Sequence, residues 1–244
     1  MQTIFAEEPW ALRPAYHSLS GFDLRHIFPD ILHAYHLGCG RDLLGSALVE
    51  MVTAAFFGVG SIEHRLAEAT RRLKQYAKQQ KLNLRLKKLT KSKLGWSKTK
   101  YPELKSSGFD TYVVQQWLLH EISAVADPGL DAKLVLALWA SNHAISLWSN
   151  NGTRWLNDDE KRNVREAGLL YLRCYVSLAE NALQGQRRLY RIRPKLHLLH
   201  HLFVRDGYAN PHCYSTWMDE DALKHLMKTL RCTDRRTAEE RLLQ

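Results

Sequence analysis

Two parts of the sequence concentrate side chains that can bind a metal ion. The first repeats such residues at a spacing of three: Asp30, His33, His36 and Cys39. The second is rich in histidine and is followed by a cysteine: His197, His200, His201, His212 and Cys213. Zinc is commonly held by two closely spaced ligand pairs, so one candidate zinc set comprises His36, Cys39, His197 and His200. The spacings match no standard zinc motif, and burial of these histidines in a helical core is the competing interpretation.

A third cluster is acidic and opens a predicted helix late in the chain: Asp219, Glu220 and Asp221, in the stretch MDEDALKH. Acidic residues are common in the first turn of a helix, where they cap backbone amides and compensate the helix dipole. A second interpretation pairs this cluster with Asp30, because two-metal phosphoryl transfer needs carboxylates from distant segments that converge on divalent ions. The residues alone leave both interpretations open.

Two longer stretches carry a family resemblance. The run PDILHAYHLGCGRDLLGSAL (29–48) resembles the segment of eukaryotic cut-and-paste DDE/D transposases that holds the second catalytic Asp and turns, here at GCGRD, into an inserted helical domain. The run RIRPKLHLLHHL (191–202) is similar to the Lys-Pro-Lys-x-His-x-x-x-His segment that often precedes the helix with the catalytic Glu. The comparison is with the hAT, CACTA and Plavaka-like groups of the ribonuclease-H-like superfamily. The resemblance implies that Asp30 and Glu220, with Asp219 and Asp221 as alternates, are catalytic carboxylates that hold Mg²⁺.

One part of the family pattern has no counterpart. These transposases carry a first catalytic Asp on an early strand, whereas only 29 residues precede Asp30 and Asp23 is too close to serve. We therefore expect the C-terminal part of a transposase, truncated or domesticated, that is inactive as a nuclease on its own.

The basic charge is concentrated in one block. The chain has a net charge of +10, and residues 71–100 contain 12 basic side chains and no acidic one. The rest of the chain contains 23 basic and 25 acidic residues, so its net charge is close to zero. The predicted contacts to DNA phosphates are Arg71, Arg72, Lys74, Lys78, Lys81, Arg85, Lys87, Lys88, Lys91 and Lys93. The alternatives are a solubilising face and a site for an acidic protein.

Hydrophobic periodicity predicts a mainly α fold, a helical bundle that resembles the transposase insertion domain with at most a remnant of the ribonuclease-H-like sheet. We expect helices after Gly40, from Ser61 through the basic block, from Asp110 or Thr111, and from Asp131 and Asn157. We expect one more helix after Pro194 and another over TWMDEDALKHLMKTLR (216–231). The last predicted helix is DRRTAEERLLQ (234–244). The only strand candidates are FDLRHIF (22–28) and LHLLHHLFV (196–204). Predicted segments are an N-terminal extension (1–40), the insertion-like domain (41–190) and C-terminal helices (191–244).

Composition limits the remaining choices. We find no apolar run long enough to cross a bilayer and no secretory signal, and the four cysteines are scattered as in reduced intracellular proteins. We expect DNA as the partner, with no membrane and no small-molecule substrate. The sequence is compatible with a homo-oligomer, and we expect a location in the nucleus or cytoplasm. The function predicted is that of a transposase-derived DNA-binding protein. The alternative is a non-catalytic basic helical module that binds nucleic acid or protein.

Overall fold

The computed structural model describes residues 15–21, 28–127, 129–150, 152–204 and 209–231, and every structural statement below concerns these residues. They form helices and loops without a β-strand, so the predicted mainly α class is confirmed. The elements are η1 (Ala15–Ser18), η3 (Leu32–Cys39), α1 (Gly40–Thr53), α2 (Ile62–Gln79), α3 (Gly108–Ser123), α4 (Ala132–Asn150), α5 (Asp158–Gln184), α6 (Lys195–Val204), η4 (Pro211–Tyr214) and α7 (Trp217–Arg231). The strand candidate at 196–204 is wrong, since these residues form most of α6. Most of the candidate at 22–28 and all of the predicted last helix at 234–244 lie outside the described residues.

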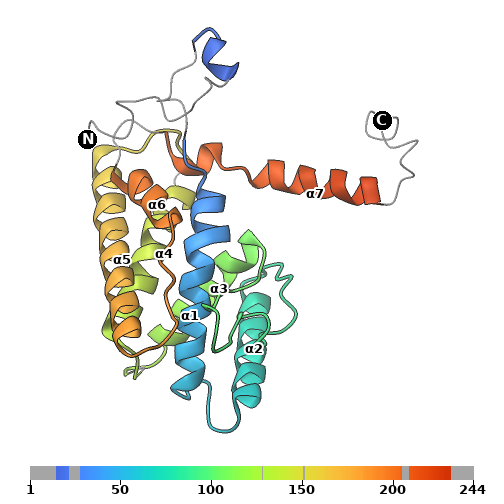
Figure 1. Cartoon of the computed structure of the whole chain (residues 1–244), viewed down its shortest axis with the longest axis vertical. Helices are drawn as coiled ribbons and strands as arrows, with labels where there is room; N and C mark the ends of the chain where they lie inside the picture. Colours follow the sequence, from blue (N-terminus) through green and yellow to red (C-terminus); the bar gives the residue numbers. More distant parts are fainter. Residues whose placement is uncertain (1–14, 22–27, 128, 151, 205–208, 232–244) are drawn as a thin grey trace.

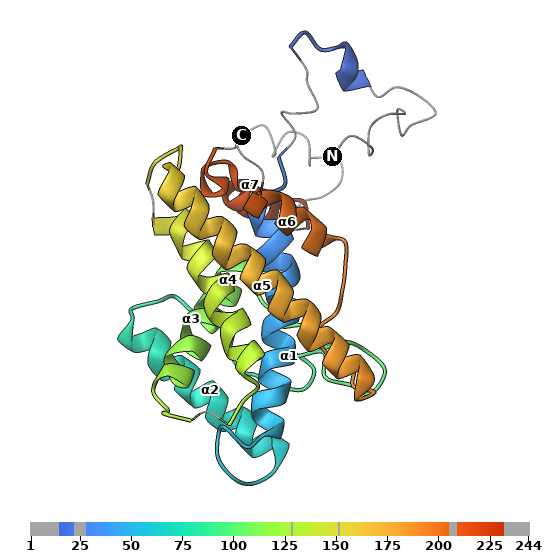
Figure 2. The same cartoon turned by 90° about the vertical axis from the view of Figure 1, so that its left-hand side faces the viewer.

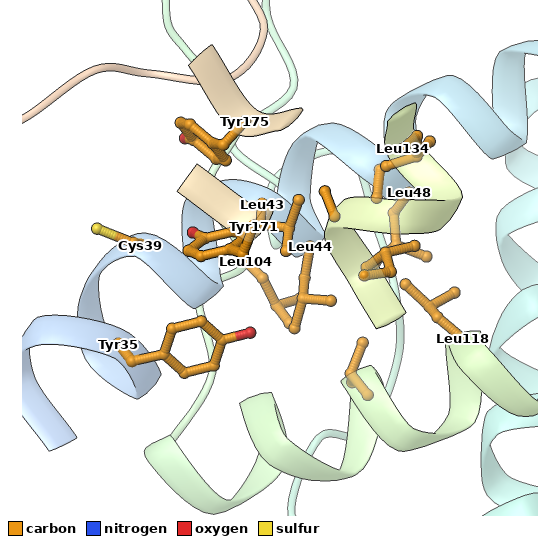
Figure 3. Packing of buried hydrophobic residues seen from close by; sticks show 14 of the residues in the cluster. Tyr35, Cys39, Leu43, Leu44, Leu48, Leu104, Leu118, Leu134, Tyr171 and Tyr175 are labelled. Atoms are coloured by element: carbon orange, nitrogen blue, oxygen red, sulfur yellow. The ribbon is translucent and has the colours of Figure 1, made fainter. Parts of the chain in front are cut away.

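The helices pack into one bundle, in which α4 and α5 lie side by side along their length (Figures 1 and 2). Their shared core continues into η3 and α1, where Tyr35 and Leu43 are fully buried close to Tyr171 of α5, which is also fully buried (Figure 3). A single cluster of buried apolar residues runs from Ile31 to Phe203. This core fixes the positions of the surface groups described below.

The N-terminal part of the bundle is a kinked helical stretch rather than a turn. Residues 32–39 are wound as a π-helix that leads directly into α1, and Gly38 alone departs from helical dihedrals. A side chain at Gly38 would collide with Lys195, because an added Cβ would lie 2.6 Å from its Cδ. The turn predicted at GCGRD is therefore a local kink that lets α6 approach, as π-bulges and glycines often allow.

The predicted helix through the whole basic block is also wrong. Helix α2 begins after its cap Ser61, as predicted, but ends at Gln79, and Lys81 has a positive φ of 54° that stops the helix. The following coil is held to the bundle by three buried side chains, Leu86, Leu89 and Leu94. Its backbone is fixed where Arg85 donates to Asp110 and Leu89 donates to Thr70.

The remaining helix starts follow local capping chemistry. Asn157 begins α5 with a complete capping box, and α3 starts at Gly108 behind its cap Ser107, slightly earlier than predicted. Helix α7 extends away from the bundle in Figure 1 and carries exposed apolar side chains at Leu223, Leu226 and Met227. None of the helices in the described ranges combines the length and apolar character that a membrane span requires.

Candidate nucleic-acid interface

Asp30 is a hydrogen-bond acceptor that joins two distant segments. Its Oδ1 accepts from the backbone amides of Leu32 (3.2 Å) and Thr216 (3.1 Å). Its Oδ2 accepts from the amide of His33 (3.0 Å) and the hydroxyl of Thr216 (2.7 Å), and it contacts the His33 ring. Burial opposes ionisation here, but the hydrogen bonds from Thr216 and His33 outweigh it and lower the pKa of Asp30. We call this arrangement the Asp30 latch.

The latch brings the predicted acidic segments to the same end of the bundle. Thr216 immediately precedes α7, so Asp30 lies beside the helix that contains the acidic cluster. Within that helix Asp219 is exposed, and Asp221 is 3.4 Å from the ammonium group of Lys224. Glu220 belongs to α7, but its side chain lies outside the description. The catalytic roles of these four acids stay predictions.

The described residues do not form a recognisable metal centre. Nowhere in these ranges do three or more His, Cys, Asp or Glu side chains gather in a way that could hold an ion. Both oxygens of Asp30 already accept hydrogen bonds from the chain, so they fit a latch better than a magnesium site. We therefore derive no catalytic step through Mg²⁺.

The predicted zinc set is also not assembled. Cys39 is fully buried, and this burial raises the pKa of its thiol to about 12, which opposes the thiolate that zinc needs. Burial lowers the pKa of His36 to about 4, and its ring lies against Trp217 and Tyr112. His197 instead faces His201, with 2.9 Å between their Nε2 atoms. These contacts support core and surface packing for the histidines.

Basic side chains gather around a hollow of about 520 Å³ beside the first turn of α3. Five cationic side chains line it: Arg41, Arg85, Lys87, Lys93 and Lys105. They come from two parts of the chain: Arg41 belongs to α1, and the other four belong to the connection between α2 and α3, residues 80–107. Ser106, Ser107 and Asp110 complete the polar wall, and we call this site the basic hollow.

The fold explains why these cations point outward. Leu86 and Leu89 are buried, whereas the intervening Lys87 and Lys88 are exposed. The buried leucines therefore anchor the coil while the lysines face solvent. Asp110, the carboxylate in the wall, is buried and already accepts from the Arg85 amide, so it contributes to backbone structure.

Other cations of the block have internal partners. Arg71 and Arg72 both bind Glu68, which holds the pKa of that carboxyl at about 2. Arg72 also reaches Glu121 at 3.1 Å, and Lys91 is 2.7 Å from Glu63. Lys74, Lys78, Lys81 and Lys88 are exposed and make no ion pair within the described ranges. The predicted binding residues thus divide into structural pairs and cations that are available to a ligand.

Arg41 and Lys105 are missing from the sequence-predicted interface. Arg41 lies 30 residues before the basic block, and its guanidinium also donates to the carbonyl of Ser106. Lys105 follows the block, and its amide binds the carbonyl of Lys93 over 2.8 Å, which closes the loop that surrounds the hollow. No spacing rule connects these positions in the sequence, because only the packed loop brings them together.

The fold and site define a mainly α protein with a localised basic hollow. This chain matches no family model, no curated protein and no solved structure.

Proposed function

We propose that the protein binds the phosphate backbone of double-stranded DNA through the basic hollow. The observation that carries the proposal is the convergence of five cations, from α1 and from the connection between α2 and α3, beside a helix N-terminus. Each phosphate neutralised by a cation releases counterions, which makes such contacts a main source of affinity for DNA. The first backbone amides of α3 add the partial positive charge of a helix dipole.

The arrangement favours a polyanion over a purely solubilising surface. A solvated surface normally intersperses both signs of charge, and α5 shows this pattern, with Lys161 paired to Asp158 and Arg162 paired to Asp159. The hollow contains one carboxylate, and that carboxylate is committed to a backbone amide. Like charges held together by the fold are stabilised when a polyanion binds.

We further propose that the chain derives from the C-terminal part of a DDE/D transposase and acts without catalysis. Support comes from the residue patterns around Asp30 and Lys195 and from the contact between Asp30 and the start of α7. In this proposal the former catalytic aspartate has a structural role, because its oxygens accept hydrogen bonds from Thr216 and His33. Binding by the hollow does not depend on this ancestry.

The test compares two variants that remove the same amount of charge. The first, Arg85→Gln/Lys87→Gln/Lys93→Gln, removes three cations of the hollow. The control, Lys161→Gln/Arg162→Gln/Arg165→Gln, removes three from α5, on the other side of the bundle from α2 in Figure 1. Fluorescence anisotropy with a mixed-sequence DNA duplex measures the affinity of each.

We expect the hollow variant to lose affinity by on the order of 10- to 100-fold and the control to lose only a few-fold. Equal losses would mean that net charge, and no particular site, holds the DNA. A matched RNA duplex distinguishes the two nucleic acids, because the proposal predicts that the DNA duplex binds at least as tightly.

A further inference from the structure

A second pocket differs from the basic hollow in its lining, which is aromatic and largely apolar. It has a volume of about 500 Å³ and is formed by η3, α3, α4, η4 and the beginning of α7. Four aromatic side chains contribute to its wall: Phe109, Tyr112, Trp148 and Trp217. No Asp, Glu, Lys or Arg is among its described lining residues. We call it the aromatic pocket.

Two buried polar atoms belong to residues of this wall and have no hydrogen-bond partner in the described structure. One is Nδ1 of His36, whose side chain is 4% exposed, and the other is Oγ of Ser215. Buried polar atoms are nearly always paired, and an unpaired one costs about 1–3 kcal/mol. Ten buried side-chain atoms of the described residues lack such a partner, and these two belong to residues that line this pocket.

The geometry at His36 favours a flat ligand. The ring centroid of His36 is 5.1 Å from that of Trp217 and 6.5 Å from that of Tyr112. Aromatic groups at such distances stack or meet edge to face, which favours planar rings over aliphatic groups of equal size. A volume of this size is also typical of pockets that bind small molecules.

We propose that the aromatic pocket binds a neutral, planar aromatic small molecule whose edge hydrogen-bonds to His36 and Ser215. The aromatic walls supply contact area, and the two polar atoms fix the orientation of the ring. Because no Asp, Glu, Lys or Arg is among the described lining residues, the walls favour a neutral ligand over nucleotides and other phosphorylated molecules. This site is therefore separate from the proposed DNA interface.

Cys213 gives a direct way to observe occupancy. It lines the pocket and is exposed, whereas Cys39 and Cys174 are buried. In a Cys232→Ser background, modification by N-ethylmaleimide then reports mainly on Cys213. Two probes have a hydrogen-bonding edge: indole offers a donor and quinoline offers an acceptor. Two serve as controls: 1-methylindole has no strong hydrogen-bonding group, and cyclohexanol is not planar.

We expect indole or quinoline to slow the modification of Cys213 in a saturable manner, and cyclohexanol to have no effect. The better of the two should bind about tenfold more tightly than 1-methylindole, which corresponds to one hydrogen bond in a buried site. His36→Phe keeps a flat ring and removes Nδ1, so it should abolish this preference. Ser215→Ala should reduce it, which provides a second variant if His36→Phe does not fold.

Failure of both indole and quinoline to protect Cys213 at millimolar concentration would overturn the proposal. Equal protection by 1-methylindole would overturn the role of the polar edge. A DNA duplex serves as the separating control, because it should leave Cys213 modification unchanged whether or not DNA binds the basic hollow.

Discussion

The Asp30 latch and the basic hollow use charged side chains in opposite ways. Asp30 accepts hydrogen bonds from three residues, and two of these bonds come from Thr216, 186 positions away. In the hollow, five cations face one another around open space, and the single carboxylate beside them accepts from a backbone amide. Asp30 is surrounded by hydrogen-bond donors of the chain, whereas the hollow gathers cations with a single carboxylate among its lining residues.

This difference distinguishes charged residues that stabilise the fold from charged residues that bind a ligand, which cannot be told apart from the sequence. A charged group with internal partners contributes to stability, and its loss should change unfolding. A cluster of like charges held close together contributes little to stability and can contribute strongly to binding. Mutations at the latch should therefore affect stability, and mutations at the hollow should affect affinity.

The largest expected effect concerns His36, beside the latch. Burial lowers the pKa of His36 to about 4, and the ring also senses Asp30 and His212. The unfolded chain binds a proton near pH 6.5, so the unfolded state takes up more protons than the folded state between about pH 4 and 6.5. The contribution of His36 to the free energy of unfolding should therefore rise by about 2 to 3 kcal/mol as the pH increases through this range. Burial raises the pKa of Asp42 to about 7, so that carboxyl contributes in the opposite direction.

Urea unfolding at several pH values measures this dependence. His36→Phe should remove the His36 contribution, so the difference in unfolding free energy between wild type and this variant should change with pH over this range. His64→Gln, which changes an exposed histidine, should leave the wild-type dependence intact. A full pH dependence in His36→Phe would show that another group carries it.

The next effect tests the latch itself. Asp30→Ala removes the acceptor for several hydrogen bonds, and we expect a loss of about 2 kcal/mol in the free energy of unfolding. Thr216→Val should cost about 1 kcal/mol, and the double variant should lose less than the sum because the two residues bind each other. Denaturant unfolding of the four proteins completes this cycle.

If Asp30 held a magnesium ion, the stability of the protein would depend on Mg²⁺. In that case Mg²⁺ would raise the melting temperature of the wild type, and Asp30→Asn would abolish the increase. The latch instead predicts a melting temperature that does not respond to Mg²⁺.

A smaller effect separates position in the sequence from position in the fold. Lys105 lies outside the basic block but lines the hollow, whereas Lys98 lies within the block and lines a different depression beside Arg187. Lys105→Gln should weaken DNA binding by about two- to fivefold, and Lys98→Gln should have a smaller effect. Anisotropy measured at one salt concentration decides between them, and the opposite order would show that charge density along the chain matters more than the hollow.

Local signals in the sequence predicted much of the helical fold. Apolar spacing and caps such as Ser61 and Asn157 marked the starts of α2 and α5, because capping depends on residues three positions apart. The end of α2 was not predictable in this way. Leu82, Leu86 and Leu89 fit a helical stripe, yet they pack against the bundle from a coil after Lys81, with Leu86 and Leu89 buried and Leu82 partly buried.

The candidate sites were less accessible from the sequence, because they depend on contacts between distant segments. The basic block pointed to Arg85, Lys87 and Lys93, but not to Arg41 or Lys105, which join them only through loop packing. Likewise, the histidine spacing that suggested zinc did not reveal that His36 faces Trp217, 181 residues later. The spacing of residues in the sequence indicated candidate site residues, but only the packed fold determines what each of them contacts.

The most direct test of the central claim is the salt dependence of DNA binding by the wild-type protein. If the five cations of the hollow contact phosphates, the logarithm of the association constant should fall with the logarithm of salt concentration with a slope of about −4 to −5. Between about 50 and 200 mM salt, the affinity should then fall by on the order of several hundred-fold. A slope near zero, or no binding at the lowest salt concentration, would contradict phosphate recognition by the basic hollow.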